Sequence, residues 1–191
     1  MGRVVVSQFV TVDGVVEDPG GSEKHERGGW AFQFDRGDEG DKFKLDEVMA
    51  SDALLLGRVT YEGFAEAWPS RTGEFADKFN GMPKYVVSTT LETAEWNNST
   101  LIGDDVAGEV SRLKEQVAGD ILVNGSVQLV RTLLEHDLVD EWRLMVFPIV
   151  LGGGKRLFDD GAESKALRLE EARPVGPDGI VILTYRPAAD E

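Results

Sequence analysis

Hydrophobic residues along the chain form short continuous runs in some stretches and recur at helical spacing in others. Residues 3–12 are mostly β-branched and apolar, which predicts a buried strand that ends at the turn Asp13-Gly14. The same signals recur along the rest of the chain. The strands expected from them are residues 53–56, 84–88, 99–102, 121–123, 141–150, 167–172 and 180–186, and the expected helices are 41–50, 59–68, 72–80, 106–117 and 126–136.

Strands and helices alternate through the middle of the chain, and strands dominate its end. This order predicts an α/β fold with a central, mostly parallel mixed sheet flanked by helices. Residues 167–172 and 180–186, joined by a turn at 176–179, are expected to form an antiparallel pair at one edge. With 191 residues and no internal repeat or linker, one domain over residues 1–191 is the simplest expectation.

The charge and the cysteine content exclude several functional classes. Lys and Arg number 20 against 35 Asp and Glu, so the net charge is 20 − 35 = −15. Such an acidic chain is not expected to bind nucleic acid or an anionic membrane. The absence of cysteine excludes thiolate metal sites, disulfides and cysteine nucleophiles, and no metal is expected. No targeting or membrane-spanning stretch is recognised, which makes the cytoplasm the expected compartment.

Residues 17–40 carry glycine, charge and aromatic side chains without a clear period. A long stretch of this kind is typical either of a mobile functional segment, such as a lid over a site, or of an ordinary surface loop. The sequence leaves both interpretations open.

Three predicted strand-to-helix turns are the best candidates for a binding site. They begin at Gly57, Ser88 and Asn124. In open α/β sheets, ligands bind beyond the carboxyl ends of the strands, where glycine lets them approach the backbone. The N-terminus of the following helix offers free N–H groups and partial positive charge to a phosphate. Three such turns at one edge would suit a ligand with several phosphates, even in an acidic protein.

Each turn alone also has an ordinary interpretation. Ser126 is a plausible helix N-cap, and Arg58 a plausible solvated surface residue. Sharper motifs are missing: the sequence has no P-loop, no G-x-G-x-x-G after the first strand, no H-E-x-x-H and no G-x-S-x-G. Histidine occurs only at His25 and His136, and a structural role is expected for His136.

At these turns the sequence resembles the dihydrofolate reductase-like superfamily. It is most similar to the branch that includes the C-terminal reductase domain of the riboflavin-biosynthesis deaminase–reductase. The segments that carry the resemblance are 7–14, 52–61, 86–91, 124–126 with 138–141, and 148–158. The resemblance implies a single-domain dihydrofolate reductase-like fold, a reductase of the dihydrofolate or 5-amino-6-(5-phosphoribosylamino)uracil type, and NADPH as cofactor.

Carried over by position, the resemblance implies a cofactor site made of the three turns and the glycine triplet near residue 153. Arg58 would contact the 2′-phosphate or pyrophosphate, and Thr60 the pyrophosphate. Relatives often carry arginine where this chain has Thr89, which leaves the choice between NADPH and NADH open. The implied cofactor-binding residues are Gly57, Arg58, Thr60, Ser88, Thr89, Thr90, Asn124, Gly125, Ser126, Val127, Gln128 and Gly153.

The substrate side is less specific. Asp41 lies near the position of the carboxylate that holds the pterin in folate reductases, and either Asp41 or water would supply the proton that hydride transfer requires. Phe9, Phe64 and Trp68 would wall an apolar slot, with Asp13 beside it; ordinary core packing explains the aromatic residues equally well.

These observations together predict an NADPH-dependent reductase that transfers hydride to a small planar heterocycle, pterin-like or pyrimidine-like. The alternative is a non-catalytic nucleotide- or flavin-binding protein of the same fold, and a third class is a structural or interaction subunit. Relatives of this branch are often dimers, so a homodimer is expected. The apolar run 144–151 would supply either its interface or part of the core.

Overall fold

The structure is a computed structural model that describes residues 1–158 and 163–188. Its chain divides into two compact units, each with a hydrophobic core of its own. The two units are unit 1, Met1–Val6 with Lys44–Val139, and unit 2, Ser7–Phe43 with Asp140–Glu191.

Unit 1 is built on parallel strands, in the order β4–β3–β2–β5–β1. Every pairing in this series is parallel, and β1 contributes its residues 3–6 to the pairing with β5. Since parallel neighbours need a crossover, helices lie between most of these strands in the sequence. The strands are β1 (Arg3–Thr11), β2 (Ser51–Gly57), β3 (Lys84–Val87), β4 (Ser99–Ile102) and β5 (Asp120–Val123).

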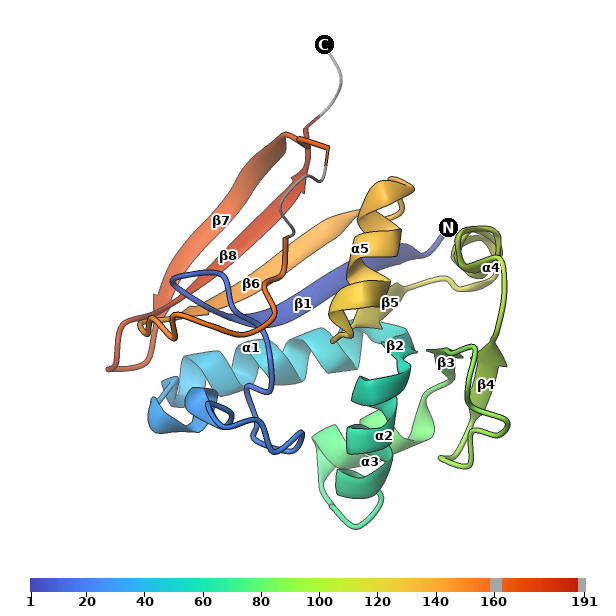
Figure 1. Ribbon diagram of the computed structural model, residues 1–191, viewed down its shortest axis with the longest axis horizontal. Helices are drawn as coiled ribbons and strands as arrows, with labels where there is room; N and C mark the ends of the chain where they lie inside the picture. Colours follow the sequence, from blue (N-terminus) through green and yellow to red (C-terminus); the bar gives the residue numbers. More distant parts are fainter. Residues whose placement is uncertain (159–162, 189–191) are drawn as a thin grey trace. The chain divides into compact units, whose positions relative to one another are not determined.

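The core of unit 1 joins its strands to helices α2 and α3, which lie together in Figure 1. Leu54, Val86 and Leu122 from three neighbouring strands meet Tyr61 of α2 and Phe79 of α3, all nearly inaccessible to solvent. The continuous apolar runs of β2 and β5 therefore reflect strands that are buried on both faces. The helices are α1 (Gly37–Ala50), α2 (Arg58–Ala67), α3 (Glu74–Gly81), α4 (Val106–Gln116) and α5 (Val127–Glu135).

A fully buried lysine ties the end of α3 to the sheet of unit 1. The Lys84 ammonium donates to the backbone carbonyls of Asn80, Met82 and Asn97 at 2.8 to 2.9 Å. It also lies 4.3 Å from the centroid of the Trp96 ring, within cation–π range. The three carbonyls come from the end of α3 and from the segment before β4, so one side chain joins two connections.

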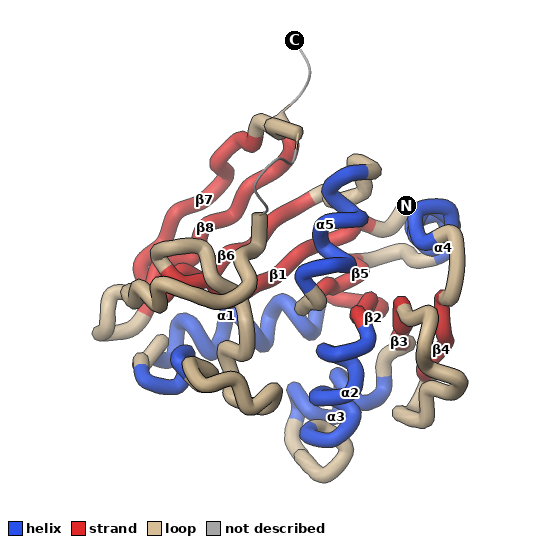
Figure 2. Tube along the Cα trace, viewed as in Figure 1, coloured by secondary structure: helices blue, strands red, loops and turns tan. Residues whose placement is uncertain are grey.

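Unit 2 contains an antiparallel series, β6–β8–β7, whose last two strands form the long hairpin of Figure 2. The hairpin turns at residues 176–179, as predicted, and the pairing slips by one residue between Leu169 and Glu171. A short 3-10 helix precedes α1. These elements are β6 (Glu141–Phe147), β7 (Leu167–Val175), β8 (Ile180–Pro187) and η1 (Trp30–Gln33).

The core of unit 2 is centred on Phe147. Its ring makes edge contacts with Phe9, Trp30 and Phe34 at centroid distances of 5.1 to 6.0 Å. Trp30 is fully buried, and its indole N–H donates to the carbonyl of Glu17 at 2.9 Å. Edge-to-face packing of this kind stabilises an aromatic cluster beyond the burial of its area.

The predicted fold class is confirmed: parallel strands alternate with helices, and the last two strands are antiparallel. Several bounds differ from the prediction: α1 begins at Gly37 rather than at residue 41, and β7 runs to Val175 rather than to residue 172. Two further differences have a clear physical origin. The strand expected at 141–150 ends at Phe147, because Pro148 has no N–H for the ladder and the Ile149 amide donates back to Phe147. The irregular stretch 17–40 contains η1 and the start of α1, with Trp30 in the core.

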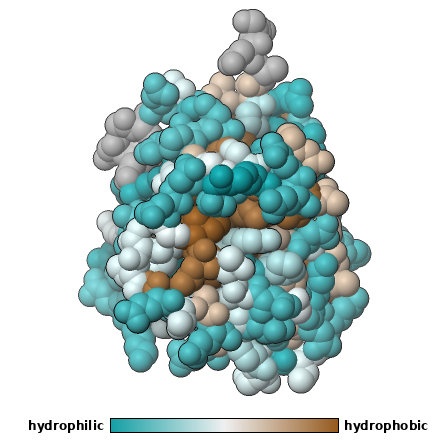
Figure 3. Space-filling model, turned by 90° about the vertical axis from the view of Figure 1, so that its right-hand side faces the viewer, coloured by the Kyte–Doolittle hydropathy of each residue, from teal (hydrophilic) through white to brown (hydrophobic). Residues whose placement is uncertain are grey.

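The surface in Figure 3 is mainly hydrophilic, with one strip of hydrophobic residues across its middle. This agrees with the charge of −15. Among the described residues, no helix combines the length and the apolar character needed to cross a membrane.

Replacing Lys84 by Met is expected to destabilise the protein by about 2 kcal/mol at pH 7, because three carbonyls around the buried ammonium lose their donor. Burial lowers the pKa of Lys84 from 10.5 to about 8. The unfolded chain therefore binds more protons between these pH values, and the wild type should gain stability relative to Lys84→Met as the pH rises from 8 to 10.

Urea unfolding at pH 7, 8, 9 and 10 measures both effects. Lys78→Met, which changes a partly exposed lysine of α3, is the matched control. If the difference in unfolding free energy between wild type and Lys84→Met stays constant across this pH range, the lowered pKa of Lys84 is contradicted.

Candidate functional site

The carboxyl ends of β2, β3 and β5 lie at one edge of the sheet of unit 1. Gly57, the last residue of β2, pairs with Val87 of β3, and Leu54 of β2 pairs with Leu122 of β5. The register therefore brings the predicted turns after β2, β3 and β5 to the same edge. This is the geometry that the sequence analysis required for a shared ligand site.

The turns after β2 and β5 interlock at two glycines. The Gly57 amide donates to the Gly125 carbonyl at 3.2 Å. A Cβ on Gly57 would lie 2.1 Å from Ser126 Oγ, and a Cβ on Gly125 would lie 2.6 Å from Thr60 Oγ1. Gly125 also has φ +129°, a conformation that side chains rarely adopt. Both positions thus require glycine, and the two hydroxyl groups occupy the space that side chains would take.

The helices that follow these turns begin without side-chain caps. Gly57 precedes α2 and Ser126 precedes α5, and neither makes a side-chain hydrogen bond to the helix it precedes. The ordinary interpretation of Ser126 as a capping side chain is therefore not what the structure shows. Free amides at two neighbouring helix starts, together with the partial positive charge there, are suited to an anion.

The turn after β3 is organised by Ser88. Its amide donates to Ile102 of the neighbouring β4, and its hydroxyl oxygen accepts the amides of Thr90 and Leu91 at 3.2 and 3.0 Å. Ser88 is buried, whereas Thr89 and Thr90 are exposed. Ser88 therefore shapes the turn, and the two threonines are the residues of this segment that solvent can reach.

Arg58 forms an ion pair that the sequence analysis missed. Its guanidinium lies 2.9 Å from a carboxylate oxygen of Glu62, one helical turn further along α2, and both side chains are almost half exposed. The spacing of four residues on a helix is the signal that would have revealed it. An anion that binds Arg58 must compete with Glu62 or share the guanidinium with it.

The remaining predicted residues of this edge lie at the start of α5. Asn124 is half-buried at the end of β5, and Gln128 is exposed in the first turn of the helix. Val127 is the first residue of α5, and the Ser126 carbonyl accepts the amide of Val130. All the predicted cofactor residues except Gly153 thus belong to unit 1.

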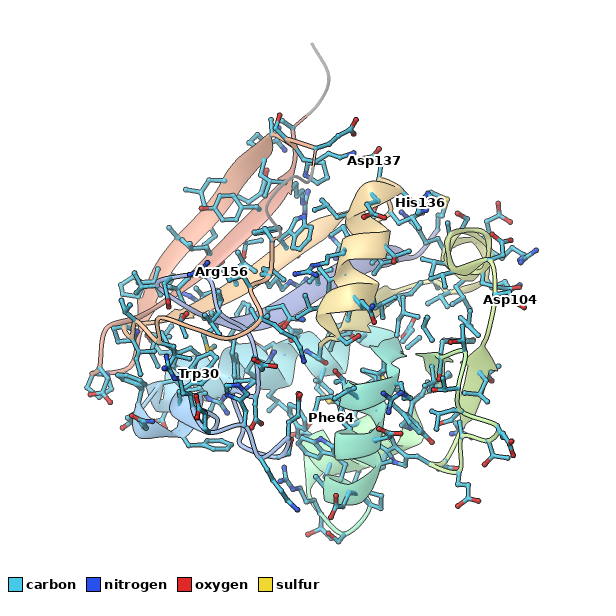
Figure 4. All side chains as sticks on the ribbon, in the orientation of Figure 1. Trp30, Phe64, Asp104, His136, Asp137 and Arg156 are labelled. Atoms are coloured by element: carbon cyan, nitrogen blue, oxygen red, sulfur yellow. The ribbon has the colours of Figure 1, made fainter. Side chains whose placement is uncertain are left out.

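The aromatic residues proposed to wall a slot belong to two different cores. The ring centroid of Phe64 of α2, labelled in Figure 4, lies 5.5 Å from that of Phe79. Trp68 stacks on Phe75 with their ring centroids 5.0 Å apart. Phe9 packs in the core of unit 2. The contacts of Phe64 and Trp68 favour the core-packing interpretation that the sequence left open.

Unit 1 also has a cavity of about 790 Å³ bordered by α2, α3 and the segment 93–97. Tyr61, Asn80 and Trp96 line it, and none of the predicted cofactor or substrate residues does. Among the described residues, no cluster of three or more histidine or carboxylate side chains could hold a metal ion.

The carboxylate of Asp13, in unit 2, holds a loop in place and does not stand open to a ligand. It accepts the Thr11 hydroxyl at 2.6 Å and the amides of Gly152 and Leu151 at 2.8 and 3.2 Å. These hydrogen bonds, that of Thr11 most of all, lower the pKa of Asp13 from 3.8 to about 2. The carboxylate thus joins the turn after β1 to the glycine triplet.

The two other predicted residues of unit 2 are placed differently. Asp41, on the first turns of α1, pairs with Arg36, and its side chain is 66% exposed. Its carboxylate therefore faces solvent and Arg36 rather than an enclosed binding position. Gly153 lies beneath the guanidinium of Arg27, which would be 3.4 Å from a Cβ at this position.

Comparison with models of protein families identifies one family. Residues 3–181 match the RibD C-terminal domain. Two curated proteins of Bacillus subtilis (strain 168) are similar over most of their length. The uncharacterized protein YyaP is 28% identical over 96% of this chain and 94% of its own length. The uncharacterized protein YwjB is 28% identical over 91% of this chain and 92% of its own length.

Solved structures give the same fold. A putative riboflavin biosynthesis protein from Shewanella sp. PV-4 superposes with a TM-score of 0.74 at 22% identity, over 98% of this chain and 99% of its own. Dihydrofolate reductase from Enterococcus faecalis, complexed with NADP(H), superposes with a TM-score of 0.64 at 14% identity, over 98% of each chain. At these identities the likeness establishes the predicted dihydrofolate reductase-like fold and no more.

A third structure belongs to a larger protein. The deaminase/5-amino-6-(5-phosphoribosylamino)uracil reductase from Thermotoga maritima gives a TM-score of 0.66 at 15% identity, over 98% of this chain. The match covers 57% of that protein.

The pKa of Asp13 leads to a prediction about acid stability. Because its folded value of about 2 lies below the ordinary 3.8, the charged carboxylate stabilises the fold above pH 4, and this contribution is lost as the pH falls toward 2. Asp13→Asn should cost roughly 1 kcal/mol at pH 7 after allowance for solvent screening, and much less near pH 2.

Thermal unfolding of wild type and Asp13→Asn between pH 2 and pH 7 measures the difference in their stability. Asp104→Asn, at an exposed aspartate before α4, is the control, and it should have little effect at any pH. An Asp13→Asn effect of equal size at both ends of the range would show that the charge is not responsible.

Proposed function

The chain belongs to the RibD C-terminal domain family, and on that premise we propose that it is a reductase that binds NADPH at the carboxyl ends of β2, β3 and β5. The observation that carries the proposal is the interlock of Gly57 and Gly125, where side chains are excluded and two uncapped helices begin. A dinucleotide needs such a close backbone approach and such amides for its phosphates. The residues present therefore fit the cofactor that the family implies.

Each turn is assigned a part in holding the dinucleotide. Arg58 and the first amides of α2, with Thr60, bind its phosphates. The exposed Thr89 and Thr90 bind the adenosine side, on the turn that Ser88 shapes. The turn from Asn124 to Gln128 supports the pyrophosphate and the nicotinamide ribose. NADPH supplies the hydride for a small planar heterocycle, and the chain binds and orients both partners.

The proton for this reduction comes from water or from Asp41. Asp41 is exposed and paired with Arg36, so water is the simpler source. Among the candidate substrate residues, Phe9 keeps a partly exposed ring, beside Phe147. Asp13 and Gly153 contribute by fixing the loop that follows Pro148 rather than by direct contact.

The pairing of Asp41 also favours a second candidate, a nucleotide- or flavin-binding protein of the same fold without turnover. NADPH oxidation in the presence of pterins, quinones and pyrimidine ribosides separates the two candidates. Binding of NADPH without oxidation on any of these compounds would support the second. We further propose that the protein is cytoplasmic and that it forms a homodimer. Light scattering tests the dimer. Since β6 is mostly buried, exposed Pro148 and Val150 are the parts of 144–151 open to a partner.

Arg58→Ala is expected to weaken NADPH binding roughly tenfold and NADH binding much less, because only NADPH has a 2′-phosphate for the guanidinium. Fluorescence titration with each cofactor measures the two affinities. Arg71→Ala, which removes an exposed arginine stacked on Trp68, is the control. Equal losses for NADPH and NADH would remove the assignment of Arg58 to the 2′-phosphate.

Gly57→Ala is expected to weaken the binding of both cofactors at least tenfold. Its Cβ would lie 2.1 Å from Ser126 Oγ and 3.0 Å from the Ser126 backbone nitrogen, so the turn after β5 must move. Gly81→Ala is the matched control, since nothing lies within 4 Å of its Cβ position. Isothermal titration with NADPH, after circular dichroism has verified the fold, should show normal affinity for Gly81→Ala. Normal affinity for Gly57→Ala would rule out this edge as the cofactor site.

A further inference from the structure

Phe9 and Asp41, two residues predicted for the substrate side, both contact a third residue of unit 2, Arg36. The Arg36 guanidinium lies 5.7 Å from the centroid of the Phe9 ring, within cation–π range. Its Nε donates to a carboxylate oxygen of Asp41. Sequence analysis did not single out Arg36, because only the folded chain brings these three side chains together.

The backbone around Arg36 packs closely against the turn between β7 and β8. Asp178 of that turn accepts the Asp35 amide at 2.6 Å. A Cβ on Gly176 would lie 2.4 Å from the Asp35 carbonyl oxygen and 2.5 Å from the Arg36 carbonyl carbon. Gly176 has φ +65°, a conformation that favours glycine. This close approach of two backbones fixes where Arg36 stands, just before α1.

The first turn of α1 leaves room for the Arg36 side chain. The Gly40 amide donates to the Arg36 carbonyl at 3.2 Å. A Cβ on Gly40 would lie 2.7 Å from Arg36 Cβ and 2.9 Å from Arg36 Cγ. Glycine within a helix is less stable than alanine. Here it provides the space through which the stem of Arg36 passes.

Most of the donors of the Arg36 guanidinium remain open. Asp41 engages Nε, and among the described residues the two terminal nitrogens have no hydrogen-bond partner. The side chain is 33% exposed, so a ligand can reach it. Because arginine presents its N–H groups in a planar fork and accepts no hydrogen bond, this position suits a ligand group with an oxygen acceptor.

The local charge favours an uncharged acceptor over an anion. The Asp41 carboxylate lies against the guanidinium, so the pair has no net charge. The chain as a whole carries −15, which disfavours a phosphate or carboxylate where no excess positive charge offsets it. The carbonyl oxygen of an uncharged ring accepts the same N–H groups without this repulsion. A planar ring can also pack against the partly exposed ring of Phe9.

We propose that Arg36 determines substrate specificity by donating to a ring carbonyl oxygen of an uncharged oxo-heterocycle that lies against Phe9. Asp41 is a positioning residue, which holds the guanidinium by its Nε. This proposal rests on the proposed function, since it takes the reducible compound to be a planar heterocycle. It goes further in requiring an oxo group on the ring and an uncharged group at Arg36.

The test compares ligands in which amino groups replace ring oxo groups: pterin with 2,4-diaminopteridine, and 6-aminouracil with 2,4,6-triaminopyrimidine. In isothermal titrations of the wild type at pH 8, the oxo compound of at least one pair should bind roughly tenfold more tightly, because the amino analogue leaves a charged donor without its acceptor. Arg36→Met keeps an apolar stem against Phe9 and should bind both members equally. Arg168→Met, at an exposed arginine of β7, is the matched control and should keep the preference.

A second set of variants moves Arg36 without removing its charge. Gly40→Ala places a methyl group against the Arg36 stem and favours the helix, so the fold should persist while the oxo preference falls severalfold. Gly20→Ala is its control, since the nearest atom to that Cβ is in Phe32 at 3.8 Å. Asp41→Asn retains an oxygen acceptor for Nε and should keep most of the preference, whereas Asp41→Leu should lose it. A purely structural effect would change the affinity for both members of a pair equally. Circular dichroism verifies the fold of each variant.

The proposal is overturned if the wild type binds none of the four compounds or binds the members of each pair equally. It is also overturned if Arg36→Met or Gly40→Ala keeps the full oxo preference. Since these titrations use no cofactor, their outcome is separate from that of the NADPH titrations. Binding of NADPH without an oxo preference would refute this proposal alone, and an oxo preference without NADPH binding would refute the cofactor assignment alone.

Discussion

The candidate site depends on one close approach, that of the backbone after β2 to the backbone after β5. The Gly57 amide reaches the Gly125 carbonyl, and neither position has room for a Cβ. This approach is possible because β2 and β5 are parallel neighbours whose ends lie at one edge. It leaves the first amides of α2 and α5 free of side-chain caps, which gives a protein of charge −15 a local site for an anion.

In unit 1 the backbone amides are available to an external anion. In unit 2, by contrast, carboxylates of the chain accept hydrogen bonds from the chain's own N–H and O–H groups. Asp13 accepts the Gly152 amide of the glycine triplet, Glu17 accepts the Lys155 amide that follows the triplet, and Asp18 shapes the loop that precedes Trp30. The donors of Asp18 are local, five and seven residues further along the chain. The sequence shows Asp13 and Glu17 only as acidic residues, because Gly152 and Lys155 lie more than a hundred residues away. The same separation explains why the glycine triplet, predicted beside the site, is fixed by Asp13 and lies beneath Arg27.

The sequence predicted the strands and helices well where a continuous apolar run or a helical period was present. The three turns could be found because glycine and serine follow buried strands, and their common edge follows from parallel pairing. Other features depend on distant contacts. The burial of Trp30 depends on Phe147, and the burial of Lys84 on carbonyls of two connections. Asp41 could be located from its spacing, but its partner Arg36 is a feature of the folded loop.

The most direct test of the cofactor assignment is an NMR titration of the ¹⁵N-labelled protein with NADPH, followed residue by residue. The account predicts that the amides of residues 57–60, 88–90 and 124–128 shift together along one binding curve. Shifts confined to other places, such as the cavity lined by Tyr61 and Trp96, or the absence of any shift at saturating cofactor, would contradict it.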